Sequence, residues 1–101
     1  MAMNSLSSIA ASGLQAAQTQ LQASANNIAN LSTDGFHRQE VVQSEQAHGG
    51  VTTSVVRAAD AGADLQSDVV AQLQAKNAFL ANLAVFKTSK KLTGTLLDEA
   101  A

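Results

Sequence analysis

The chain contains no cysteine, tryptophan or tyrosine, and only 14% of its 101 residues are charged. The absence of cysteine excludes disulfides, thiolate chemistry and cysteine-based metal sites, and it leaves the cellular compartment open. A net charge of −2 offers no basic surface for nucleic acid. Without tryptophan or tyrosine the chain also lacks the ring platforms on which bases usually stack. The composition therefore predicts no nucleic-acid partner.

Long apolar runs are also absent. No stretch approaches the roughly 18 apolar residues that indicate a membrane span. The amino-terminal residues 1–4 contain no basic segment leading into an apolar one, so we expect no cleavable secretory signal. Large apolar side chains are few as well, because 20 of the hydrophobic residues are alanine. A chain with so small a supply of core-filling side chains is expected to use the surface of a partner.

Residues 5–31 follow a helical pattern. The larger apolar side chains alternate with alanine or serine in steps of four and three, which is typical of a coiled-coil seam. The seam consists of Ala10, Leu14, Ala17, Leu21, Ser24, Ile28 and Leu31. Its small residues narrow the ridge and permit close approach of a second helix. Gly13 interrupts this pattern as either a flexible point or a close-packing position.

The run ANNIANLSTDGF at residues 25–36 closes that helix. Asn26, Asn27 and Asn30 are mediocre helix formers whose side chains can bond the nearby backbone, so a helix end is predicted here. Residues 32–35 supply turn chemistry, and Gly35 is free to adopt a positive φ. Two interpretations of the asparagines remain open: capping and turn formation, or hydrogen bonds across a subunit interface.

The helical period fades from Phe36 onward. β-Branched residues at 41–42 and 51–56 flank a polar stretch that ends in two glycines, which predicts a short β-hairpin. An isolated hairpin is marginal in water, so we expect it to pack on the helices or on neighbouring subunits. Residues 58–64 are predicted to form a loop.

A second helix is predicted to begin between Asp64 and Ser67, either of which suits the N-cap. Asp68 is well placed for the helix dipole. The apolar stripe of this helix consists of Val69, Leu73, Leu80, Leu83 and Phe86, flanked by Val70, Phe79 and Val85. Seven-residue spacing then leads to Lys87, Lys90 and Gly94, so an ideal seam is expected to fail after Phe86.

The two ends of the chain resemble the bacterial flagellar axial family, which comprises rod, hook and hook-associated subunits. ANNIANLSTDGF contains every anchor of the family pattern A-N-N-I/L-A-N, two residues, T, one residue, G-F/Y. Residues 74–98, QAKNAFLANLAVFKTSKKLTGTLLD, are similar to the closing helix of the family, with the A-N step at Ala81-Asn82. Asn77 departs from this pattern, in which an arginine is expected.

The resemblance implies a fold and a role. Family members are exported unfolded through the flagellar type III apparatus and polymerise into a tube, with their terminal helices paired as an inner coiled coil. Because only residues 36–63 separate the two ends here, the chain is similar to a short proximal-rod subunit. The implied location is the periplasm-spanning rod of the flagellar basal body. The implied partners are copies of the chain itself, other rod and hook subunits, and the export apparatus.

The sequence signals for catalytic or metal-binding residues are weak. His37 with Glu40, or with His48 across the hairpin, lacks the spacing of a metal site, and solvated hairpin residues are the favoured interpretation. Asp34-Gly35 lacks the alternating oxygen ligands of a calcium loop, so it is interpreted as a turn. No G-x-S-x-G elbow is present, and neither histidine has a nearby acid in a recognisable catalytic arrangement. The sequence predicts neither catalysis nor a metal, cofactor or small-molecule substrate.

The sequence therefore predicts one mainly α domain in which two long helices pair as an antiparallel coiled-coil hairpin around a short β-hairpin. Its parts are residues 1–35, 36–63 and 64–101. The predicted function is a structural subunit of the flagellar rod, and the alternative is a small helical adaptor or export chaperone. The predicted assembly interface comprises Leu14, Leu21, Asn26, Asn27, Ile28, Asn30, Thr33, Gly35, Phe36, Phe79, Leu80, Asn82, Leu83 and Phe86.

Overall fold

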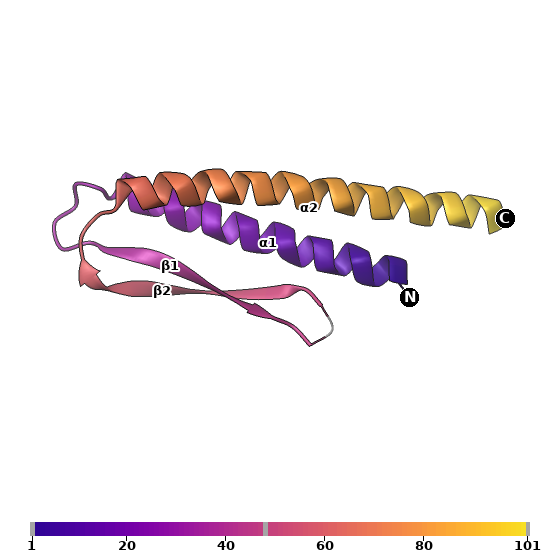
Figure 1. Ribbon diagram of the computed structural model, residues 1–101, viewed down its shortest axis with the longest axis horizontal. Helices are drawn as coiled ribbons and strands as arrows, with labels where there is room; N and C mark the ends of the chain where they lie inside the picture. The colour runs from indigo at the N-terminus through magenta and orange to yellow at the C-terminus, as the bar shows by residue number, and fades with distance from the viewer. Residues whose placement is uncertain (1, 48, 101) are drawn as a thin grey trace.

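The computed structural model describes the backbone of residues 2–47 and 49–100 and the side chains of residues 6–47 and 49–97. Helix α1 (Ala2–Ala29) is followed by strands β1 (His37–Glu45) and β2 (Val51–Ala61) and by helix α2 (Leu65–Ala100). Figure 1 shows an elongated molecule in which α1 lies between α2 and the hairpin. The molecule measures 62 × 24 × 14 Å. The predicted pair of long helices with an intervening hairpin is confirmed.

The ends of both helices have local causes. Helix α1 ends within the asparagine cluster, where the Asn30 side chain donates from Nδ2 to the carbonyl of Asn26 (2.9 Å). Gly35 adopts a φ of +74° in the turn that follows, which confirms its predicted left-handed conformation. Asp64 caps α2, since its Oδ1 accepts a hydrogen bond from the backbone N–H of Ser67 at 3.1 Å. Of the two predicted N-cap residues, the structure selects Asp64.

The interface between the helices is built from small residues. The seam predicted for α1 is confirmed at Ala10, Ala17 and Ser24, which are all buried. On α2 a line at seven-residue spacing, formed by Asp68, Ala75, Asn82 and Ser89, lies against α1, where Asp68 contacts Asn27 and Ser89 contacts Ser7. A Cβ built on Gly13 would lie 2.6 Å from Cγ of Asn82, so Gly13 marks a point of close helix approach.

The apolar stripe predicted for α2 is wrong in part, because Leu83, Phe86 and the flanking Phe79 are half-buried whereas its other members are exposed. Leu73 and Leu80 are 58% and 53% exposed, and Val69, Val70 and Val85 are exposed as well. The small and polar line from Asp68 to Ser89 lies against α1 instead, because it lets the two backbones approach more closely than leucine would. The side-by-side pairing also continues past Phe86 through buried Ser89, whose Oγ lies 2.8 Å from that of Ser7.

Residues 58–61 belong to β2, which corrects the predicted loop. The strands are antiparallel, with Val41 opposite Val55 and Gln39 opposite Arg57, and the register shifts between His37 and Gln39. Across this bulge, Nδ1 of His37 lies 2.8 Å from the carbonyl oxygen of Ala58. The irregular pairing extends the hairpin almost to the start of α2. Arg38 lies between the two shifted pairs, and the bulge redirects its side chain.

The hairpin lies along α1, not α2. Its inner face includes Val41, Val51 and Thr53, which are half-buried. Near the tip, the backbone N–H of Val51 donates to Oγ of Ser12 on α1 at 3.1 Å. The outer face of the hairpin is exposed.

Candidate functional site

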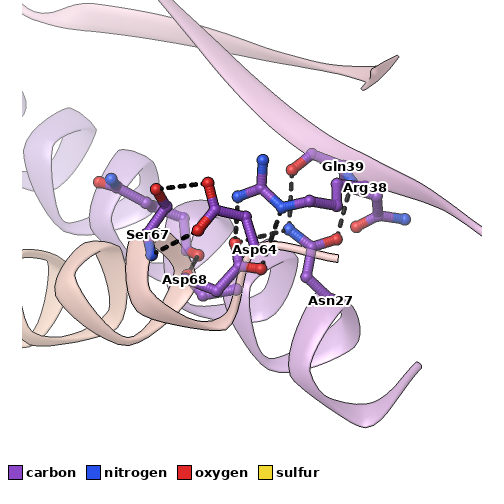
Figure 2. A network of polar contacts seen from close by, with 8 residues as sticks. Asn27, Arg38, Gln39, Asp64, Ser67 and Asp68 are labelled. Carbon is purple, nitrogen blue, oxygen red and sulfur yellow. Dashed lines mark hydrogen bonds and ion pairs between the residues drawn. The ribbon is translucent and has the colours of Figure 1, made fainter. Parts of the chain in front are cut away.

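A polar junction joins three elements close to the point where α2 begins (Figure 2). We define it as Asn27 of α1, Arg38 and Gln39 of β1, and Asp64, Ser67 and Asp68 at the start of α2. Asn27 and Asp68 are 3% and 2% exposed, although both are polar. Among the described residues, no buried side-chain nitrogen or oxygen lacks a hydrogen-bond partner. The junction is therefore a fully satisfied polar centre in a chain with little apolar core.

Asn27 acts as a substitute for a neighbouring strand. Its Nδ2 donates to the carbonyl of Gln39 at 3.0 Å, and its Oδ1 accepts from the N–H of Gln39 at 2.7 Å. This pair of bonds reproduces the exchange found between paired residues of an antiparallel sheet. The same Nδ2 also donates to Oδ1 of Asp68 at 3.0 Å. One carboxamide therefore connects α1 to both β1 and α2.

Asp68 and Arg38 form a bidentate ion pair. Arg38 donates from Nε to Oδ2 of Asp68 at 3.0 Å and from Nη2 to Oδ1. The hydrogen bond with Asp68 raises the pKa of Arg38 above its ordinary value. A planar guanidinium suits this two-point contact with a carboxylate. The pair fixes the base of the hairpin against the first turn of α2.

Asp64 completes the junction as the helix cap. Besides the backbone bond, its Oδ2 accepts from the hydroxyl of Ser67 at 2.8 Å. The backbone N–H of Ser67, then its hydroxyl and the nearby charge of Arg38, lower the pKa of Asp64. The cap stays ionised at neutral pH and complements the positive end of the helix dipole.

The sequence-predicted interface residues occupy three environments. Asn27 is buried, and Asn26, Thr33, Gly35 and Leu80 are exposed. The half-buried ones are Leu14, Leu21, Ile28, Asn30, Phe36, Phe79, Asn82, Leu83 and Phe86. The three asparagines differ in role as well as in exposure. Asn30 caps α1, and Asn27 joins the three elements of the junction. Whether any of them bonds a neighbouring subunit stays a prediction.

Sequence reasoning missed the roles of Arg38 and Gln39 and the partner of Asp68. Arg38 and Asp68 are 30 positions apart, and no local pattern signals their pairing. Among residues 6–47 and 49–97 there is no group of three or more His, Asp or Glu side chains arranged to hold a metal ion. His37 contacts the β2 backbone, while the suggested pairing with His48 lies outside the described residues. Within the described chain, neither helix has the length and apolar character needed to cross a bilayer.

The fold and the junction define a class of protein: an elongated helical hairpin that keeps small and polar residues inside and presents larger apolar residues outward. Residues 8–37 match the family described as flagella basal body rod protein, which confirms the resemblance to the rod family. The matched segment contains most of α1, the asparagine cluster and the turn to β1. This is a family of structural proteins of the flagellar basal body, so the match supports a structural role in the rod. Comparison with curated proteins gave no match.

Proposed function

We propose that this chain is a subunit of the flagellar rod that polymerises through its terminal helices and does no chemistry. The observation that carries the proposal is the inverted distribution of side chains. Among residues 6–47 and 49–97 the buried apolar residues are alanines, whereas eleven leucine and valine side chains are more than 40% exposed. Exposed apolar area on this scale marks an interaction surface.

The exposed residues continue to the end of α2. Leu96 and Leu97 are 55% and 67% exposed, and this end of α2 extends past the start of α1 (Figure 1). A second element is needed to cover them, since α1 does not reach that far. We assign this covering role to neighbouring rod subunits. The polar junction would hold the hairpin and the two helices in one fixed unit while such contacts form.

The test is incorporation into isolated basal bodies, together with motility, in cells whose own copy of the gene has been removed. The unaltered chain is expected to restore motility and to be present in basal bodies. Leu97→Lys should still be exported, because export through the flagellar apparatus uses an unfolded chain, but should reduce incorporation. Gln18→Lys on the exposed side of α1 is the matched control and should incorporate normally. Absence of the unaltered chain from basal bodies, with a one-to-one complex between it and an exported subunit, would instead indicate an adaptor.

A further inference from the structure

The outer sides of α2 and of the hairpin are both unpartnered in the single chain. α1 lies between them, so they are on opposite sides of the molecule (Figure 1). On α2, Leu73, Lys76 and Leu80 are exposed and form one stripe at helical spacing. We call these three residues the α2 stripe.

The outer face of the hairpin has matching chemistry. Paired residues of an antiparallel ladder project to the same side, and Glu40 pairs with Val56 while Val42 pairs with Ser54. Val42 and Val56 are 49% and 42% exposed, and Glu40 is exposed beside them. We call Glu40, Val42 and Val56 the hairpin patch. It presents two aliphatic side chains and an acid, whereas the α2 stripe presents two aliphatic side chains and a base.

The charges along the chain are separated in the same way, with bases on α2 and an excess of acids in the segment that includes the hairpin. Helix α1 has no charged residue. The charged residues of the segment 69–97 are Lys76, Lys87, Lys90 and Lys91. The segment 34–68 instead has an acidic excess, from Asp34, Glu40, Glu45, Asp60, Asp64 and Asp68 against Arg38 and Arg57. Among the described residues the ion pair is Arg38 with Asp68, so Glu40 and Lys76 are not paired within the chain.

On the basis of the proposed function, we infer that the hairpin patch of one copy docks on the α2 stripe of a second copy, with Glu40 beside Lys76. Opposite charges at the edge of an aliphatic contact fix orientation and disfavour other pairings. The two surfaces differ and lie on opposite sides of the molecule. Their contact is therefore heterologous, and it builds a ring if the rotation between copies closes and an open filament if it does not.

The experiment uses the purified chain in sedimentation measurements over a range of concentration and salt. Lys76→Glu and Glu40→Lys should each weaken self-association by about three- to tenfold, because an attractive pair becomes a repulsive one. Mixing the two variants in equal amounts should restore association. In the mixture, the acidic stripe of the Lys76→Glu copy meets the basic patch of the Glu40→Lys copy. The unaltered patch of the first variant also meets the unaltered stripe of the second, so the variants alternate.

Controls separate this contact from a general effect of charge. Glu45→Lys lies on the other face of the same strand, and Lys90→Glu lies beside the Phe86 ring, with Nζ of the native lysine 5.5 Å from the ring centroid. Both should associate as the unaltered chain does. No recovery on mixing, equal losses in the controls, or no self-association of the unaltered chain up to about 1 mM would overturn the inference. Normal incorporation of Lys76→Glu into basal bodies would do so while leaving the proposed function intact.

Discussion

The side chain of Asn27 and the main chain of Gln39 exchange two hydrogen bonds, as two residues of neighbouring strands would. The arrangement lets the end of a helix serve as an edge for the hairpin. It also explains why an asparagine near the end of α1 is buried while its neighbour Asn26 is exposed. An asparagine is suited to this position because it offers one donor and one acceptor group in the geometry of a peptide unit.

Replacing Asn27 by alanine should therefore lower the free energy of unfolding by about 2 kcal/mol, because the N–H of Gln39 and the carboxylate of Asp68 each lose a partner. Chemical denaturation of the purified chain measures the change. The matched variant is Asn26→Ala, one residue earlier on an exposed side chain, which should stay within about 0.5 kcal/mol of the parent. Equal effects of the two substitutions would contradict the role assigned to Asn27.

Gly13 and Asn82 give a second prediction. In an open helix position, glycine to alanine should stabilise by about 0.5–1 kcal/mol, and Gly94→Ala is expected to do so because nothing lies within 4 Å of its Cβ position. Gly13→Ala should instead destabilise the chain, since its methyl group would collide with the Asn82 carboxamide. Adding Asn82→Ala should recover the loss, and thermal unfolding of the parent, Gly13→Ala, Asn82→Ala and the double variant measures this coupling. A stabilising Gly13→Ala would show that the Asn82 carboxamide can move aside at little cost.

The register of the helices makes a third prediction, at Leu21 and Leu83. Contacts of Ser7 with Ser89 and of Asn27 with Asp68 place Leu21 near position 74, so Leu83 lies about 13 Å further along α2 at 1.5 Å per residue. A charge at either site should destabilise the pair of helices. Leu21→Lys and Leu83→Glu together should give the sum of the single losses, because distant sites add. Compensation in the double variant, measured by denaturation, would require a different register.

Much of this fold follows from local pattern. The steps of three and four through Ala10, Ala17 and Ser24 predict the α1 seam, and the glycine that follows the asparagine cluster predicts the turn. The face that α2 turns toward α1 could not be predicted in the same way. Hydrophobicity alone favours Leu73 and Leu80 for burial. An alanine-rich partner helix at close approach instead favours Ala75 and Ser89, so the buried face of α2 depends on α1 and not on the α2 sequence alone. The junction could not be predicted from the sequence either, because Asn27, Arg38 and Asp68 meet only after the chain has folded back.

Gly35 provides the fourth prediction. Its φ of +74° suits glycine, and an L residue with a branched Cβ is strained there even though nothing lies within 4 Å of the Cβ position. Gly35→Val should cost about 1–2 kcal/mol of unfolding free energy and should reduce incorporation into basal bodies. Gly35→Asn serves as the control, because asparagine tolerates the left-handed region. If valine and asparagine are equally stable at this position, the turn has another conformation in solution.

The cap of α2 predicts a dependence on pH. The pKa of Asp64 is lowered in the folded chain by the N–H and hydroxyl of Ser67, so the unfolded chain binds the proton more readily. The stabilisation from this carboxylate is therefore complete above the ordinary aspartate pKa of about 4, and it is lost as the pH falls through the lower folded value. Asp64→Asn keeps a capping oxygen but cannot titrate. It should melt close to the parent at low pH and slightly below it at neutral pH, whereas Asp64→Ala should melt lower than Asp64→Asn at both.

Thermal unfolding followed by circular dichroism at several pH values measures the difference. An unchanged difference between parent and Asp64→Asn across the acidic range would exclude the cap as a contributor to acid sensitivity.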